Sequence, residues 1–175
     1  MRLRTILSFL LIISLFAGCS NQADQQEEAL SAEELKDLVY QYSIDEKDAK
    51  SASITSTELI IAKKDDKETS FTLPENEFFV SIAPFIDETH PCTNHSLTGC
   101  QGELTNTTFD VYIEDDAGNI VVDETVESFD NGFIDLWLPR DQIFHAKIEY
   151  DGKVAESEIS TFEDDGTCIT TMQLM

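Results

Sequence analysis

The stretch TTFDVYIEDDAGN at residues 107–119 decides the fold class. Phe109, Val111 and Ile113 alternate with polar residues, which is the period of a strand with one buried face, and the stretch ends in DDAGN, a hairpin turn sequence. Similar short runs rich in β-branched and aromatic residues recur from Thr57 onward. We therefore expect an all-β domain, an antiparallel β-sandwich of immunoglobulin-like type. Its predicted strands are 57–62, 68–73, 77–84, 107–114, 119–126, 132–138, 143–150, 153–161 and 168–174.

A short amphipathic helix is predicted before the strands. Ser31 and Glu34 have the spacing of a capping box, and apolar residues follow at helical spacing, namely Leu35, Leu38, Val39 and Tyr42. The pattern predicts a helix over 32–43. Residues 44–55 show no clear period and are interpreted as a turn with at most one more helical turn. The sequence thus predicts a helical N-terminal segment at 31–55 and a β domain at 56–175.

The first residues have the organisation of an export signal. Arg2 and Arg4 precede an apolar run that is too short to span a bilayer. The run ends in Leu-Phe-Ala-Gly-Cys at 15–19, which resembles a bacterial lipobox, in which the cysteine becomes the first mature residue and carries acyl chains. We therefore expect a lipoprotein signal peptide at 1–18, acylation of Cys19, and a polar tether at 19–30. The domain would then be lipid-anchored at the extracytoplasmic face of a bacterial cell membrane.

The composition excludes one large class of partner. The chain has 35 acidic residues against 11 basic ones, for a formal net charge of −24. Such a chain repels phosphate backbones, so a nucleic-acid partner is excluded, and the lipid anchor is the only expected contact with a membrane. The sequence also lacks a Ser-His-Asp signature, a glycine-rich phosphate loop and a thioredoxin-type Cys-x-x-Cys.

Three cysteines remain once Cys19 is assigned to lipid, namely Cys92, Cys100 and Cys168. The first two lie in a long loop between predicted strands, together with His90 and His95, and loops of this length are commonly functional. One interpretation is a disulfide between the two loop cysteines, with the third as a buried thiol.

The other interpretation is a soft metal held by all three sulfurs. Thiolate and imidazole ligands favour Cu(I) or zinc, and a site of three sulfurs suits Cu(I). Zinc would normally take a fourth ligand, supplied by His95 or His90. The third histidine, His145, alternates with apolar residues in a predicted strand and is interpreted as a solvated surface residue.

Several blocks of sequence resemble the CueP family of exported copper-binding proteins. They are THPC at 89–92, HSLTGCQGEL at 95–104, FDNGFIDLWLPR at 129–140, STF at 160–162 and TCITTMQL at 167–174. The resemblance implies that the three cysteines bind copper with a histidine of the stretch 89–104 near them, and we expect His95 to be that ligand. It also implies a metallochaperone in copper resistance rather than an enzyme, handing copper to an acceptor such as an extracytoplasmic superoxide dismutase. The N-terminal region is shorter than in Gram-negative members, and the lipid anchor suggests a Gram-positive setting.

Two rival functions remain open. The first is a thiol-based reductase of Cu(II) or Fe(III) that uses a Cys92 and Cys100 pair. The second is a plain β-sandwich binding module with a structural disulfide. In the copper-binding hypothesis, Cys168 comes from a different segment than the loop cysteines and closes the site.

Overall fold

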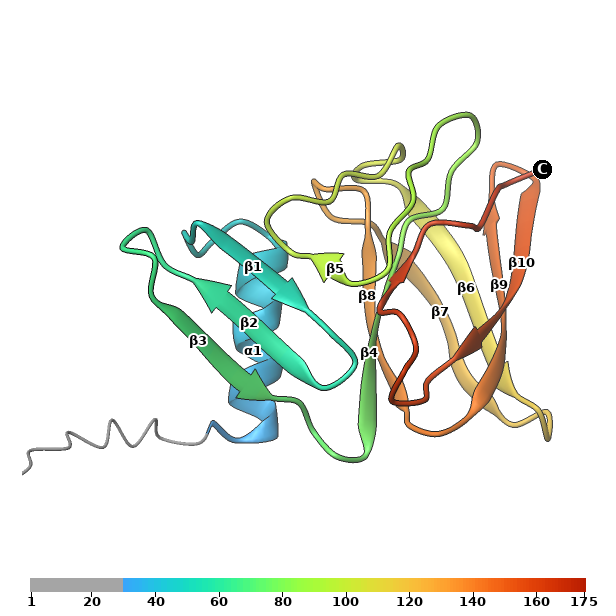
Figure 1. The fold of residues 1–175 in the computed structure, drawn as a ribbon. Helices are drawn as coiled ribbons and strands as arrows, with labels where there is room; N and C mark the ends of the chain where they lie inside the picture. Colours follow the sequence, from blue (N-terminus) through green and yellow to red (C-terminus); the bar gives the residue numbers. More distant parts are fainter. Residues whose placement is uncertain (1–29) are drawn as a thin grey trace, which may run out of the picture.

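The computed structural model describes residues 30–175 and has one helix followed by short strands (Figure 1). The helix α1 is Ala32–Ser43. The strands are β1 (Ser51–Ile54), β2 (Glu58–Ala62), β3 (Glu68–Thr72), β4 (Glu77–Ile82), β5 (His95–Ser96), β6 (Thr108–Asp115), β7 (Ile120–Glu127), β8 (Ile134–Pro139), β9 (Ile143–Tyr150), β10 (Lys153–Ser160) and β11 (Cys168–Ile169).

The strands form three sheets. The N-terminal sheet has the order β3-β2-β1-β5, the central sheet β11-β4-β8, and the outer sheet β10-β9-β6-β7. Neighbouring strands are antiparallel except β11, which runs parallel to β4. The predicted class, an antiparallel β-sandwich preceded by a short helix, is confirmed.

The central sheet lies between the other layers, and its strand β4 is buried on both faces (Figure 1). Phe78, Val80 and Ile82 of β4 pack with the outer sheet in the main core, and none of the three side chains is exposed. Phe79 points the other way and packs with the N-terminal sheet and α1. Apolar residues at successive positions are typical of a strand buried on both faces, which explains why Phe78, Phe79 and Val80 follow one another in β4.

The helix begins where the capping box predicts. The Ser31 side chain accepts a hydrogen bond from the Glu34 N–H at 3.3 Å, and the Glu34 carboxylate accepts one from the Ser31 N–H at 2.9 Å. These bonds satisfy donors that the first helical turn leaves unpaired. The buried side of α1, which includes Leu35 and Val39, packs with the N-terminal sheet in the same cluster as Phe79. The helix predicted over 32–43 is confirmed.

Strand β1 was not predicted, and the interpretation of residues 51–54 as part of a turn is wrong. The segment consists of Ser51, Ala52, Ser53 and Ile54, and small polar residues give a weak strand signal. It forms a strand because β2 and β5 pair with it on its two sides. The sequence predicted a boundary after residue 55, between the helical segment and the β domain. The pairing of β1 with β2 puts strands from both sides of that boundary in one sheet.

The last predicted strand, 168–174, is regular only at Cys168–Ile169. Beyond it the chain stays beside the segment after β4 through irregular bonds, since the Phe85 N–H donates to the Met172 carbonyl and the Leu174 N–H to the Phe85 carbonyl. Cys168 therefore lies at the start of a C-terminal segment that is hydrogen-bonded to β4 and to the residues that follow β4.

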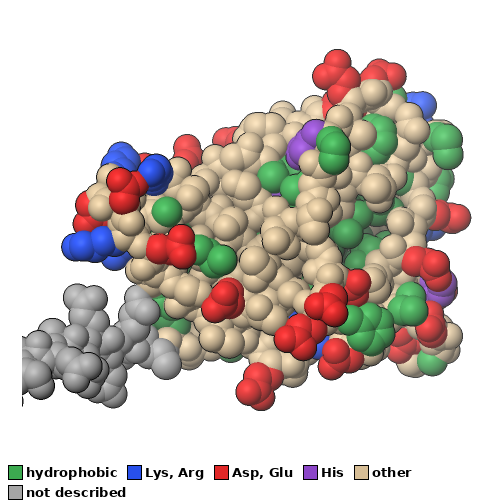
Figure 2. Space-filling model, in the orientation of Figure 1, with side chains coloured by type: hydrophobic (Ala, Val, Ile, Leu, Met, Phe, Trp, Pro, Cys, Tyr) green, Lys and Arg blue, Asp and Glu red, His purple; other side chains and the backbone are tan. Residues whose placement is uncertain are grey.

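The predicted signal peptide and Cys19 lie outside the described residues. Within residues 30–175, no helix is both long enough and apolar enough to cross a membrane. Figure 2 shows acidic side chains spread over the visible face, with several basic side chains gathered near the β2–β3 hairpin. Ion pairs between Lys50 and Asp66 and between Lys64 and Asp48 join the connection before β1 to the β2–β3 hairpin.

Candidate metal centre

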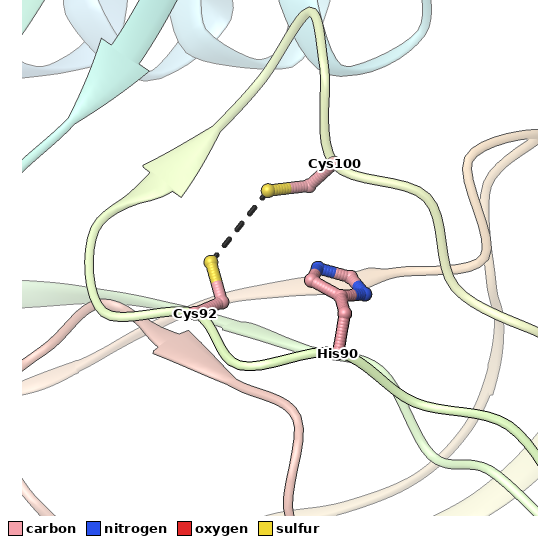
Figure 3. A group of neighbouring side chains, drawn as sticks. All are labelled: His90, Cys92 and Cys100. Carbon is pink, nitrogen blue, oxygen red and sulfur yellow. Dashed lines mark hydrogen bonds between the residues drawn. The ribbon is translucent and has the colours of Figure 1, made fainter.

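The three cysteines that the sequence singled out come together in the structure. Cys92 and Cys168 form a disulfide with their Cα atoms 5.6 Å apart, and Cys100 Sγ lies 3.6 Å from Cys92 Sγ (Figure 3). The disulfide therefore joins the loop to β11, whereas the disulfide interpretation of the sequence paired the two loop cysteines. Cys100 is the free thiol among the described cysteines.

Cys168 is positioned by the parallel pairing of β11 with β4. It lies opposite Ser81 in the register, and its side chain is buried. Its N–H donates to the Thr93 carbonyl at 3.0 Å, which ties β11 to the loop that carries Cys92. Gly166 allows this approach, because a Cβ atom there would stand 2.8 Å from the Thr93 carbonyl oxygen.

His95 is the buried imidazole of the site. Its side chain has no exposed surface, and its Nδ1 lies 3.7 Å from Cys168 Sγ. The His95 N–H donates to Thr167 Oγ1 at 3.0 Å, and that hydroxyl donates to the Ile54 carbonyl at 2.7 Å. Thr167 directly precedes β11, so its buried hydroxyl ties the start of β11 to β1 and β5.

Burial keeps the His95 ring neutral. Desolvation is the main reason that the pKa of His95 falls to about 4, and the nearby His90 adds a smaller effect in the same direction. A neutral imidazole has a free lone pair, which is the form that binds a metal. His95 Nε2 is buried and has no hydrogen-bond partner in the part of the chain that the structure describes.

The more accessible edge of the site is formed by His90, Cys92 and Cys100, which are all half-buried (Figure 3). The Ser96 N–H donates a hydrogen bond to Cys100 Sγ at 3.4 Å, and this bond holds the sulfur beside β5.

Two sets of donors have geometry suited to a metal ion. In each set the ligand atoms lie within 4.8 Å of one another, and the sets are His90, Cys92 and Cys100, and His95, Cys100 and Cys168. Cys100 belongs to both. Sulfur and imidazole donors without carboxylates fit Cu(I) or zinc and do not fit Mg²⁺ or Ca²⁺.

Phe133 is a residue of the site that the sequence did not assign. Its ring is fully buried, with its centroid 4.5 Å from that of His95 and 6.3 Å from that of His90. It follows Gly132, whose φ of +78° allows the tight turn that begins at Phe129. The signal available in the sequence was the Asn-Gly pair before Phe133, which predicts a turn but does not say what the turn packs against.

The remaining histidine lies elsewhere. His145 is exposed on the outer sheet, where its Nε2 lies 3.2 Å from a carboxylate oxygen of Asp116. It belongs to neither donor set.

Comparison with known proteins gives matches that span the whole site. The family model described as "Periplasmic copper-binding protein CueP" matches residues 34–173, from α1 to the segment after β11. A solved structure described as "Crystal Structure of S.CueP" is 38% identical, with a TM-score of 0.75, and the similarity covers 81% of this chain and 88% of that chain. A search of the curated proteins found no match.

Proposed function

The chain belongs to the CueP family, and we propose that its reduced form binds copper as Cu(I) outside the cytoplasmic membrane. The proposed ligands are the thiolates of the three cysteines and the imidazole of His95, that is Cys92, Cys100, Cys168 and His95. The bound ion is cargo, held for sequestration in copper resistance and for delivery to an acceptor.

The observation that carries this proposal is the convergence of three sulfurs with a neutral, buried imidazole. Cys92 Sγ is bonded to Cys168 Sγ, Cys100 Sγ lies 3.6 Å from Cys92 Sγ, and His95 Nδ1 lies 3.7 Å from Cys168 Sγ. Reduction of the disulfide leaves three thiols in one place. A surface binding module with a disulfide for stability has no need of a third thiol or of a buried imidazole beside it.

Copper and zinc differ in the ligands they prefer. Zinc in structural sites takes four ligands in a tetrahedron, and three thiolates with His95 would supply them. Cu(I) is a soft ion that suits sulfur donors. The matching family is described as copper-binding, which favours copper, and zinc is the competing ion in the test.

The origin of the donors in two separate segments supports delivery by ligand exchange. Cys168 belongs to β11, whereas Cys92 and Cys100 belong to the loop between β4 and β6. Movement of the loop would separate the donors and open the site to a donor from an acceptor protein such as an extracytoplasmic superoxide dismutase. We further propose that residues 1–18 are a signal peptide, that acylated Cys19 anchors the chain, and that 19–30 is a tether.

The test is a metal titration of the reduced protein. The protein is reduced with dithiothreitol, freed of the reductant without air, and titrated with Cu(I) and with Zn(II) in separate experiments. We expect one Cu(I) per chain, retained against a chromogenic Cu(I) chelator, and Cys100→Ser should lose this retention while His145→Ala keeps it. Binding of zinc in preference to Cu(I), or no tight binding of either ion, would contradict the proposal.

The disulfide itself favours a second candidate, a metal reductase. Two thiolates can pass one electron each to two Cu(II) ions, giving two Cu(I) ions and a disulfide. The structure pairs Cys92 with Cys168, so these two cysteines would be the electron source. A steady-state assay with an electron donor separates the candidates, because only an enzyme continues beyond two electrons per chain.

A further inference from the structure

We infer that the reduced site contains two overlapping Cu(I) positions that share Cys100, an outer entry position at His90, Cys92 and Cys100 and an inner holding position at His95, Cys100 and Cys168. The inference rests on the proposed function, since it concerns the same copper ion. It divides the proposed ligands between two positions, so that Cys92 binds the ion on entry and not while it is held. It also adds a role for His90 and a direction of movement for the ion.

The two positions differ in accessibility. All three donors of the outer position are half-buried. In the inner position His95 has no exposed side-chain surface and Cys168 is 5% exposed, so only the shared Cys100 is accessible. A donor from another protein therefore reaches the outer position first, and the inner position is shielded from competing ligands.

The shared sulfur lets the ion move without being released. As the ion passes inward, its bond to Cys100 Sγ is kept, its bonds to His90 and Cys92 break, and bonds to His95 and Cys168 form. The Cys168 thiol gives up its proton and the Cys92 thiolate takes one up, so the charge of the site is unchanged. No electron is transferred, and the copper remains Cu(I) throughout.

Phe133 fixes the two imidazoles relative to each other. Its ring packs against His95 at 4.5 Å and against His90 at 6.3 Å between centroids. Phe133, Ala83 and Cys168 form a small buried apolar cluster, against which Cys92 and Cys100 pack. Phe133 and Ala83 are the apolar wall beside the Cys168 sulfur. They exclude water from the side on which the ion is held.

The two histidines should therefore have separable effects on binding and transfer. We compare the purified, reduced protein with His90→Ala, His95→Gln and the exposed control His145→Ala, each loaded with one Cu(I) in the absence of air. One experiment measures equilibrium retention against a chromogenic Cu(I) chelator, and a second measures the rate of transfer to an excess of that chelator. His95→Gln keeps most of the volume of a side chain that is fully buried, and circular dichroism checks that each variant folds.

We expect His90→Ala to keep its Cu(I) affinity within about threefold while transfer slows by about tenfold, because the entry position is damaged and the holding position is intact. His95→Gln should lose affinity by about tenfold to hundredfold. His145→Ala should match the unaltered protein in both experiments.

The inference is overturned if His90→Ala leaves the transfer rate unchanged, or if it lowers affinity by tenfold or more, as a single site with both histidines as ligands requires. The His90→Ala result decides the matter alone if His95→Gln does not fold. Failure of the proposed function is a separate result, since in that case the unaltered reduced protein itself does not retain Cu(I).

Discussion

The ring of Phe133 packs against the ring of His95 with their centroids 4.5 Å apart, and neither side chain has exposed surface. The contact fixes the orientation of His95 beside Cys168. It also removes water from one side of the proposed copper site. An aromatic residue with no ligand atom therefore contributes to the site by position alone.

Shortening this side chain should affect the metal more than the fold. Phe133→Leu should lower the free energy of unfolding by about 1–2 kcal/mol, because it leaves a small cavity, and should speed Cu(I) transfer to a chelator several-fold. The matched control is Phe144→Leu, which changes an equally buried phenylalanine in the main core. Equal transfer rates in the two variants would show that Phe133 has only a packing role.

Asp135 should make stability depend on pH. Its carboxylate accepts hydrogen bonds from the hydroxyls of Ser43, at the end of α1, and Ser81, in β4, at 2.5 and 2.6 Å. Desolvation outweighs these bonds and raises the pKa of Asp135 to about 6. The folded state thus holds the proton more tightly than the unfolded state, so the stabilisation is complete below about pH 4 and is lost as the pH rises through 6.

Replacing this carboxylate with an amide should remove that dependence. Asp135→Asn should be more stable than the unaltered protein above pH 7 by about 1–3 kcal/mol, and the difference should shrink toward pH 4. Urea unfolding at a series of pH values measures this, with the exposed Asp123→Asn as the control. A lower stability of Asp135→Asn at pH 8 would mean that the ionised carboxylate is required where it lies.

Thr167 should matter through its hydroxyl rather than its volume. Thr167→Val keeps the shape but removes the bonds to the His95 N–H and the Ile54 carbonyl, leaving two buried backbone groups unpaired. We expect a loss of about 2–4 kcal/mol in the free energy of unfolding. Thr125→Val, on an exposed strand position, should change it by less than about 0.5 kcal/mol. Similar effects of the two variants in thermal or urea unfolding would contradict the role assigned to Thr167.

Replacing Cys168 of β11 should disable the proposed site and leave the fold intact. Cys168→Ser should weaken Cu(I) retention in a competition titration by about two orders of magnitude, since a soft donor of the holding position is replaced by a hard one. Circular dichroism should show unchanged β structure. If Cu(I) affinity is unchanged, Cys168 is not a ligand.

Local patterns predicted most elements of this fold, whereas long-range pairing determines which residues meet at the site. The capping box at Ser31 and Glu34 predicted the helix start, and the alternation at 109–113 predicted β6. Strand β1 escaped prediction because its small residues form a strand only between β2 and β5.

The cysteines were recognised from the sequence, but their partners were not. Cys92 and Cys168 are 76 residues apart, and they meet because β11 pairs in parallel with β4, which no local pattern encodes. His90 and His95 lie in the same loop, so the sequence could not tell which is buried. Both rings pack near Phe133, which reaches the site from a turn in another part of the chain.

The most direct measurement of the proposed copper site is X-ray absorption at the copper edge on the reduced protein carrying one Cu(I). We expect a first shell dominated by sulfur with one imidazole nitrogen, and the loss of one sulfur in Cys168→Ser. A first shell made only of nitrogen and oxygen, or a sulfur count that Cys168→Ser leaves unchanged, would contradict it.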